Sequence, residues 1–250
     1  MRLGVIGAGH LAGALLEGLH RSGFPADMIL LSPRGRAAAF AQRWGFTIAA
    51  SNEALVRECD VVLLTVRSGV ATAAVADLPW RRGQVLLSAC AGVPIAEFAM
   101  VKARTVRIMP ITAASLGASP TLLFPHEPEA AQLMARLGPV VELDTEQQFE
   151  IATTSAAIYG WAQQLIRASA DWSAAQGLDA RKARQINALT FVAAGRMVNE
   201  STAPMKTLIE SLATPGGITE AGLDHLREAG ALDAWEEACD TVLARLTSRR

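Results

Sequence analysis

Glycine and other small residues lie near the N-terminus with the spacing of a phosphate-binding turn. The run GAGHLA, residues 7–12, follows a short apolar segment and precedes a stretch with helical periodicity. In such a turn Gly7 allows the tight bend, Gly9 lets the backbone approach a pyrophosphate, and Ala12 lets helix and strand pack closely. Unpaired N–H groups and the positive dipole end of the helix then receive the phosphates. An ordinary glycine turn can share this spacing, but its place between a strand and a helix, at the start of a β/α alternation, predicts a dinucleotide site.

The residues after the second predicted strand indicate which dinucleotide is bound. A site for NAD has an acidic residue there, which accepts a hydrogen bond from the ribose 2′-hydroxyl. This chain instead has Ser32, Arg34 and Arg36 in the run SPRGR. A hydroxyl and two guanidinium groups suit a 2′-phosphate, which a carboxylate would repel. The sequence therefore predicts NADP(H), the alternative being that both arginines are solvated loop charges.

Asn52 precedes a further predicted helix that starts near Glu53. Its side chain can cap that helix, since Asn is a favoured N-cap residue. Its position also allows it to reach the adenosine side of a cofactor. The two interpretations are compatible, and the sequence leaves both open.

A second glycine motif, TPGGIT at residues 214–219, joins two predicted helices. A helix beginning near Glu220 presents unpaired backbone N–H groups, and Thr219 adds a hydroxyl. Such a place suits a small carboxylate. The alternative is a simple glycine turn in which Thr219 is the N-cap of the following helix.

Short β-rich runs and helical patterns alternate through the first part of the chain. Apolar runs such as VVLLTV predict strands that are buried on both faces, as in a parallel sheet covered by helices. The alternation predicts an α/β fold with a doubly wound Rossmann sheet. The predicted strands span residues 2–6, 28–31, 61–66, 85–88, 105–108, 121–124 and 140–143, with helices over 10–21 and over 36–44, which ends at Gly45.

The composition changes after Asp144, where Ala, Gln, Leu and Arg dominate and strand patterns end. This predicts an NADP(H)-binding domain over residues 1–145 and an all-α domain over 146–250. The first helix carries apolar residues on more than one face, which needs more cover than a small bundle supplies. We therefore expect a homodimer joined through this domain. The predicted helices span residues 145–176, 180–199, 203–212, 220–228 and 232–247.

Composition excludes several classes of protein. The 250 residues are 51% apolar and 19% charged, with a net charge of −1, so we expect no nucleic-acid surface. No uncharged stretch is both long enough and free of proline to span a membrane, and no secretory signal is evident. The four histidines have no ligand spacing, so no metal is expected. Three cysteines without CxxC spacing indicate a reduced, soluble, cytoplasmic protein.

Four segments along the chain resemble the pyrroline-5-carboxylate reductases, and the resemblance covers nearly the whole chain. They are LGVIGAGHLAGALLEGL at 3–19, CAGV at 90–93, VRIMPIT at 106–112 and TPGGITEAGL at 214–223, of which the last is the most specific. The resemblance implies a homodimeric enzyme of proline biosynthesis with a Rossmann domain and a helical dimerisation domain. It implies reduction of the cyclic imine of 1-pyrroline-5-carboxylate to proline with NAD(P)H.

The same resemblance implies roles for individual residues. The pyrophosphate turn would be lined by Gly7, Gly9, His10 and Leu11, and the adenosine phosphate by Ser32, Arg34 and Asn52. The nicotinamide half would lie along Arg67, Cys90, Ala91, Met109 and Pro110. The substrate carboxylate would be held by Thr214, Gly216, Gly217, Ile218 and Thr219, with the catalytic Thr219 hydroxyl near the imine nitrogen. An iminium accepts hydride directly, so the protein needs only to position substrate and cofactor.

The chain departs from the family pattern around the nicotinamide and substrate. Ile111 stands where the family has Asn, Ser119 where it has Gly, and Arg67-Ser68 where it has Lys-Pro. The family's SGSGPAY segment matches residues 155–161 with most positions changed. These changes leave open which cyclic imine is the substrate, and motivate a second interpretation, a non-catalytic paralogue that binds NADP(H).

The 3-hydroxyacid dehydrogenases, which share the two-domain plan, are a further alternative. They place a catalytic lysine on the first long helix after the Rossmann domain. The lysines here are Lys102, Lys182 and Lys206, all outside residues 145–176.

Overall fold

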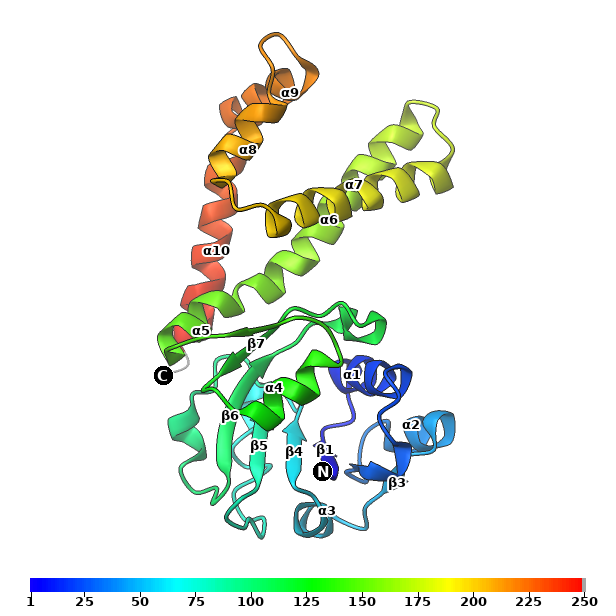
Figure 1. The fold of residues 1–250 in the computed structure, drawn as a ribbon, viewed down its shortest axis with the longest axis vertical. Helices are drawn as coiled ribbons and strands as arrows, with labels where there is room; N and C mark the ends of the chain where they lie inside the picture. The colour runs from blue at the N-terminus through cyan, green and yellow to red at the C-terminus, as the bar shows by residue number, and fades with distance from the viewer. Residues whose placement is uncertain (249–250) are drawn as a thin grey trace. The chain divides into compact units, whose positions relative to one another are not determined.

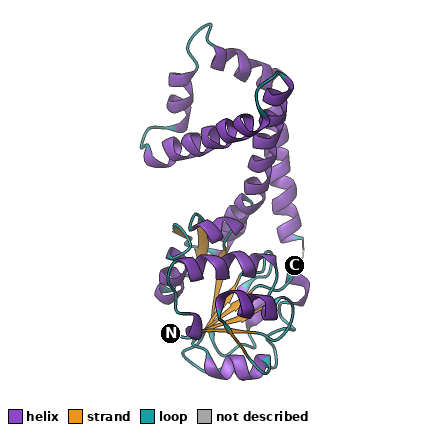
Figure 2. Ribbon diagram, turned by 90° about the vertical axis from the view of Figure 1, so that its right-hand side faces the viewer, coloured by secondary structure: helices purple, strands orange, loops and turns teal. Residues whose placement is uncertain are grey.

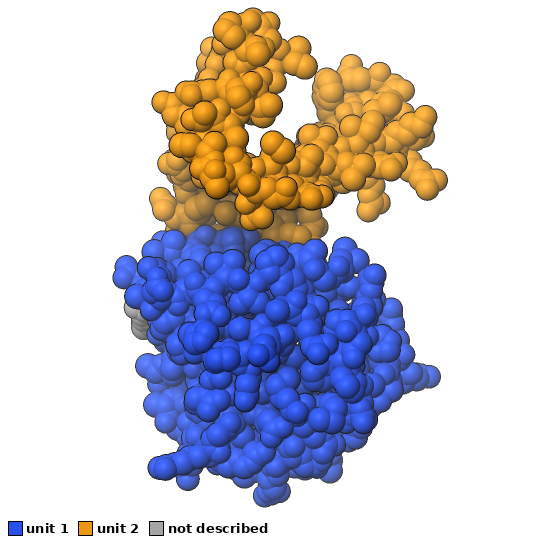
Figure 3. Space-filling view, in the orientation of Figure 1, with its two compact units in different colours: residues 1–156, 243–250 blue, residues 157–242 orange. Residues whose placement is uncertain are grey.

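The computed structural model describes residues 1–248, which divide into two compact units (Figure 3). Unit 1 holds Met1–Ala156 together with the end of the chain from Leu243, and unit 2 holds Ala157–Val242. The predicted domain boundary at residue 145 differs from the boundary between these compact units and stays a prediction.

Unit 1 contains an eight-stranded sheet in the order β3-β2-β1-β4-β5-β6-β7-β8 (Figures 1 and 2). All neighbouring strands are parallel except β6 and β7, which are antiparallel. The α/β fold with a mostly parallel sheet is confirmed. The seven predicted strands are present with ends shifted by at most one or two residues, and the short β3 is an addition. The strands are β1 Leu3–Ile6, β2 Ile29–Leu31, β3 Thr47–Ile48, β4 Val61–Leu64, β5 Val85–Ser88, β6 Arg104–Met109, β7 Thr121–Phe124 and β8 Val140–Glu142.

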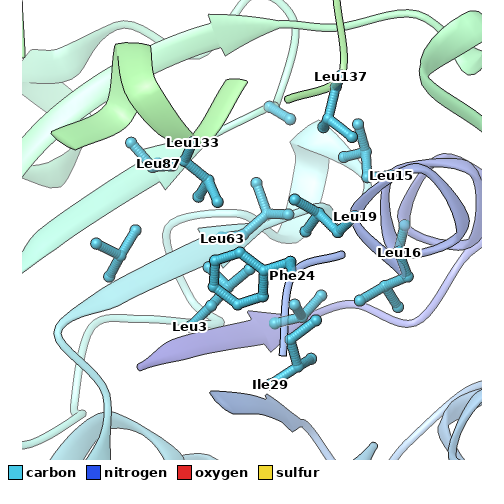
Figure 4. Packing of buried hydrophobic residues seen from close by; sticks show 14 of the residues in the cluster. Leu3, Leu15, Leu16, Leu19, Phe24, Ile29, Leu63, Leu87, Leu133 and Leu137 are labelled. Carbon is cyan, nitrogen blue, oxygen red and sulfur yellow. The ribbon is translucent and has the colours of Figure 1, made fainter. Parts of the chain in front are cut away.

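Both faces of the central strands are buried. Alternate residues of a strand point to opposite faces, so Leu63 of β4 joins one apolar cluster and Leu64 joins the other. On the first face Leu15 and Leu19 of α1 (His10–Arg21) pack over β1 and β4 (Figure 4). Each fully buried leucine of this kind contributes about 1.5–3 kcal/mol relative to an exposed one. This packing fixes the end of β1 relative to the start of α1.

Further helices of unit 1 surround the sheet. The helix α2 ends at Gly45, whose φ of +75° is the left-handed conformation of a helix C-terminal stop. The helix α4 was not predicted. The helices are α2 Ala37–Trp44, α3 Asn52–Glu58, α4 Pro128–Ala135 and α5 Glu146–Thr153, with short 3-10 turns η1 Ala26–Met28, η2 Ser68–Val70, η3 Ile95–Phe98 and η4 Thr112–Leu116.

The predicted single helix over residues 145–176 is wrong, because the chain breaks at Thr154 into α5 and α6. Two successive hydroxyl groups bond back to carbonyls of the preceding turn, Thr153 to Phe149 and Thr154 to Ile151, both at 2.8 Å. Such side-chain bonds compete with the regular helical ladder and favour a bend.

Helices alone make up unit 2, with α6 and α7 antiparallel (Figure 1). Trp161 of α6 meets Trp235 of α10 edge to face, with ring centroids 5.4 Å apart. The helical C-terminal region is confirmed. Its helices are α6 Ser155–Ala175, α7 Ala180–Glu200, α8 Met205–Leu212, α9 Ile218–Glu228 and α10 Ala231–Thr247.

Unit 2 has almost no interior of its own. Among residues 157–242, all of them described, only Ala170 and Ala183 are buried. Large apolar side chains are exposed along several helices, among them Trp172 at 67%, Leu212 at 69% and Ile218 at 95%. So much exposed apolar surface marks an interaction face.

No helix within residues 1–248 has the length and apolar character needed to cross a membrane.

Candidate functional site

The glycine turn lies where the connections of the sheet change direction. The strand order 3-2-1-4-5 places β1 beside β4. From β1 the chain continues to β2 and β3 on one side, and then returns to β4 and β5 on the other side of β1. Ligands of open α/β sheets bind in the crevice outside the carboxyl ends of the strands at this point. The residues that follow those ends are Gly7 after β1, Ser32 after β2, Thr65 after β4, Ala89 after β5 and Pro110 after β6.

The fold itself requires glycine at position 7. Its φ is +105°, and a Cβ there would lie 2.8 Å from backbone atoms of Thr65 and Val66. The Thr65 hydroxyl also donates to the Gly7 carbonyl oxygen at 2.6 Å. The turn after β1 is therefore held against the end of β4.

Gly9 is different, because the fold does not require glycine there. Its φ is −94°, and a Cβ would meet no atom within 4 Å. The N–H groups of His10, Leu11 and Ala12, which follow it, donate no hydrogen bond within residues 1–248, and the first turn of α1 carries no acidic residue. Open space beside unpaired amides at a helix N-terminus fits a phosphate group.

The loop after β2 packs against this turn. The Arg36 N–H donates to the Ala8 carbonyl at 3.1 Å, and Gly35, at φ +70°, is close to the same oxygen. Ser32 is buried and Arg34 is exposed. Within residues 1–248 the Ser32 hydroxyl makes no hydrogen bond, and neither arginine forms an ion pair. A hydroxyl and two unpaired cations beside the glycine turn fit the 2′-phosphate of NADP(H).

The interpretation of Asn52 as an N-cap is wrong. Ser51 takes that position, with extended backbone, and its hydroxyl oxygen accepts from the Ala54 N–H at 3.2 Å. Asn52 is the first helical residue of α3, so its contact with adenosine stays a prediction. The Ser51 hydroxyl is also the main reason that the pKa of Glu53 lies below its usual value, and Arg34 adds a smaller effect.

Residues predicted for the nicotinamide half lie at or just after the ends of β4, β5 and β6. The Cys90 thiol contacts the Val66 carbonyl at 3.3 Å, and burial raises its pKa. The Ser68 hydroxyl donates to the Ala91 carbonyl at 2.7 Å, which links the loops after β4 and β5. Parallel pairing of these three strands brings the predicted set to one edge of the sheet, where Cys90, Met109 and Pro110 are buried, Ala91 is half-buried and Arg67 is exposed.

Ser119, one of the departures from the family pattern, has a structural role. It is fully buried, and its hydroxyl accepts from the Ile111 N–H at 2.9 Å. It also lies 3.2 Å from the Thr121 hydroxyl. Serine here ties the two ends of the loop after Met109 and Pro110 together.

Sequence reasoning missed a buried ion cluster centred on Arg107 of β6. Its guanidinium, 1% exposed, donates to Glu150 at 3.0 Å and to Glu146 at 3.1 Å, and lies over the Phe149 ring. The carboxylate of Glu146 also accepts from the Ile95 N–H at 2.8 Å. The cluster joins α5 to β6 and to the loop after β5. Its signal was an arginine inside an apolar strand and two glutamates four residues apart.

The glycine motif of unit 2 forms a tight turn. Gly217 N–H donates to the Thr214 carbonyl at 2.8 Å, with proline second and Gly216 third at φ +72°, as a type II turn requires. A Cβ on Gly217 would lie 2.5 Å from the Thr214 hydroxyl. The Gly216 N–H is taken by the Glu220 carboxylate at 2.7 Å.

The alternative in which Thr219 caps its helix is wrong. The helix α9 begins at Ile218 with Gly217 as N-cap, so Thr219 is the second helical residue. The carboxylate of Glu220, the third helical residue, accepts from the N–H of Gly216, which precedes the N-cap. Within the described residues the Thr219 hydroxyl makes no hydrogen bond, and the N–H groups of Ile218, Thr219 and Glu220 have no acceptor. The turn therefore presents one free hydroxyl and three free amides.

Across residues 1–248 no three His, Cys, Asp or Glu side chains gather closely enough to hold a metal ion.

A glycine turn at the switch point of a mostly parallel sheet, followed by a helical region, defines a Rossmann-type dinucleotide-binding protein with a helical second part. Two family models match it in that order. "NADP oxidoreductase coenzyme F420-dependent" matches residues 2–92, and "Pyrroline-5-carboxylate reductase dimerisation" matches residues 146–248. The helical part of the chain thus matches the dimerisation model of the pyrroline-5-carboxylate reductases, and proteins of that name are similar to the chain in sequence and in fold.

Individual relatives match over almost the whole chain. Pyrroline-5-carboxylate reductase 1 of Bacillus spizizenii is 27% identical over 256 residues, which cover 95% of this chain and 85% of the relative. The 1-pyrroline-5-carboxylate reductase of Streptococcus pyogenes superposes with a TM-score of 0.87 at 24% identity, covering 99% and 98% of the two chains. The Plasmodium falciparum pyrroline carboxylate reductase, solved with NADP bound, has a TM-score of 0.86 at 19% identity, covering 99% and 97%. The last two show a shared fold.

Proposed function

We propose that the protein reduces a cyclic imine carboxylate with NADPH, converting 1-pyrroline-5-carboxylate to proline or acting on a close analogue. The observation that carries this proposal is the turn at residues 214–217 with the start of α9, where one free hydroxyl and three free amides lie together. These donors suit a carboxylate and an adjacent nitrogen. The match to the reductase dimerisation model and the similarity to pyrroline-5-carboxylate reductases support the same substrate class.

The cofactor supplies the hydride, and the Rossmann domain over residues 1–145 holds the cofactor. The glycine turn with His10 and Leu11 receives the pyrophosphate, and the loop after β2 with Asn52 receives the adenosine end. In this proposal Ser32 and Arg34 lie beside the 2′-phosphate, and a preference for NADP(H) is supported by the absence of a carboxylate directly after β2. The nicotinamide half lies along Arg67, Cys90, Ala91, Met109 and Pro110.

Residues of the helical domain over 146–250 bind the substrate. The backbone of Thr214, Gly216, Gly217 and Ile218 shapes the site, and its free amides hold the carboxylate. Thr219 is the catalytic residue, because its hydroxyl bonds the imine nitrogen. Hydride adds to the carbon of the protonated C=N bond, and its electron pair becomes the new C–H bond while the π pair returns to nitrogen as a neutral amine. No nucleophile is needed.

We also propose a homodimer joined through unit 2, supported by its exposed apolar side chains and by the match to a dimerisation model. Sedimentation at micromolar concentration tests the homodimer, and a monomer of 26.4 kDa would refute it. Cytoplasmic residence fits the free thiols of Cys59, Cys90 and Cys239.

The deciding experiment mixes protein and NADPH with a panel of five- and six-membered cyclic imino acids and follows the loss of NADPH absorbance. We expect turnover with 1-pyrroline-5-carboxylate or a near analogue. Tight NADPH binding without turnover of any imine would instead favour the non-catalytic paralogue. Oxidation of a 3-hydroxy acid with NADP⁺ would indicate the dehydrogenase class.

A further inference from the structure

The two arginines after β2 differ in how firmly they are held. Both residues are exposed, but Arg34 makes no hydrogen bond or aromatic contact within residues 1–248.

Arg36 is held at both its backbone and its side chain. Its N–H donates to Ala8 of the glycine turn at 3.1 Å, which fixes its Cα beside the pyrophosphate-binding segment. Its guanidinium carbon lies 5.0 Å from the centroid of the Phe40 ring. This is the distance of a cation–π contact, and the guanidinium N–H groups make no hydrogen bond within residues 1–248, so they are available to a phosphate.

The ring under Arg36 is itself fixed. Phe40 is 3% exposed and packs against Trp44 with centroids 5.4 Å apart. Gly13 of α1 makes room for it, because a Cβ there would lie 3.0 Å from the Phe40 Cζ. The support thus runs from the first turns of α1 through Phe40 to the guanidinium.

We propose that Arg36 is the main specificity-determining residue for NADPH over NADH, ahead of Arg34, and that Phe40 is its positioning residue. The proposal rests on the proposed use of NADP(H) and says which side chain selects it. A guanidinium already held in place loses less side-chain entropy when it binds a phosphate, so its bond contributes more net affinity. The cation–π contact with Phe40 remains intact in the bound state.

The test measures dissociation constants of NADPH, NADH, 2′,5′-ADP and 5′-ADP for the full chain and for Arg36→Ala, Arg34→Ala and Phe40→Leu. The matched control is Arg43→Ala, since Arg43 stacks on Trp44 at 4.8 Å in the same aromatic cluster but bonds Glu17 instead of the glycine turn. Melting temperatures are recorded for every variant, and Arg36→Gln provides a second, milder change at the same position.

We expect Arg36→Ala to weaken NADPH and 2′,5′-ADP by roughly 10- to 100-fold and NADH and 5′-ADP by less than about threefold. Arg34→Ala should weaken the binding of NADPH and 2′,5′-ADP less than Arg36→Ala does, and Arg43→Ala should leave all four dissociation constants unchanged. Phe40→Leu should weaken NADPH by about three- to tenfold with NADH unchanged, a selectivity that general destabilisation does not produce.

A larger loss of NADPH affinity in Arg34→Ala than in Arg36→Ala and Arg36→Gln would overturn the proposal. Equal losses for NADPH and NADH in the Arg36 variants would do the same. A wild type that binds NADH as tightly as NADPH is a separate result, because it removes the proposed cofactor preference itself.

Discussion

The hydroxyl of Thr65, at the end of β4, donates a hydrogen bond of 2.6 Å to the carbonyl oxygen of Gly7, at the end of β1. This bond joins the two strands that flank the switch point at the place where the pyrophosphate is expected. Thr65→Val keeps the shape of the side chain and removes the donor. We expect about 1 kcal/mol less stability and an NADPH dissociation constant about three- to tenfold higher, since the turn loses its tether. Calorimetric titration and thermal unfolding measure both, and Thr65→Ser, which keeps the hydroxyl, should behave like wild type.

Gly7 and Gly9 should respond oppositely to the same change. Gly9→Ala places a methyl group in open space, so the protein should lose less than about 1 kcal/mol of stability but bind NADPH at least about tenfold more weakly. Gly7→Ala forces a Cβ to within 2.8 Å of the Thr65 backbone at φ +105° and should impair folding itself. Circular dichroism melts and cofactor titrations separate the two. Unchanged NADPH affinity in Gly9→Ala would remove this glycine from the site.

Thr219→Ala should reduce turnover without loss of stability. Its hydroxyl caps nothing in α9, so we expect no change in melting temperature, while one bond to a charged imine nitrogen is worth about 1.5–3 kcal/mol. The value of kcat/KM should therefore fall by roughly 10- to 100-fold, with NADPH affinity changed by less than about threefold. The control is Thr207→Ala, an exposed threonine of α8 without a hydrogen bond within the described residues. Normal kinetics in Thr219→Ala would take the hydroxyl out of the chemistry.

Alkaline pH should destabilise the protein through Cys59. Burial raises the pKa of this thiol to about 12 from 9.0, so the folded state holds its proton more tightly than the unfolded state. The stability linked to that proton is complete below pH 9 and is lost as pH rises from 9 toward 12. Denaturant unfolding of wild type and Cys59→Ala across this range checks it. The wild type should lose more stability with rising pH than the variant, and parallel losses would contradict the prediction.

Local signals explain how much of the fold was predictable. The strands β1, β4 and β5 are apolar on both faces, and α1 has one apolar stripe, so their patterns are visible in short windows. The two-residue β3 is exposed and too short to have a period. The sequence predicts the start of α9 two residues late, because the side chain that bonds the backbone at that end belongs to Glu220 and not to Thr219.

The site divides in the same way. The glycine turns are contiguous in the chain, so their spacing alone predicts their conformation. The ion pair of Arg107 and Glu150 joins residues 43 positions apart, and their partnership exists only once β6 and α5 are placed. Ser and Asn are both good N-cap residues, so the residue types at positions 51 and 52 do not tell which of them caps α3. The choice depends on the backbone conformation, which differs by one residue between the two possibilities.

Unit 2 buries only Ala170 and Ala183 among its residues 157–242. A segment with so little interior has few contacts that protect its backbone when it is alone. At protein concentrations low enough to dissociate the proposed dimer, the amide hydrogens of unit 2 should therefore exchange with solvent, and protease should cut its helices. The sheet of unit 1 should stay protected under the same conditions. The stability of the helices of unit 2 should thus depend on protein concentration, as the proposed homodimer requires, whereas the stability of the sheet in unit 1 should not.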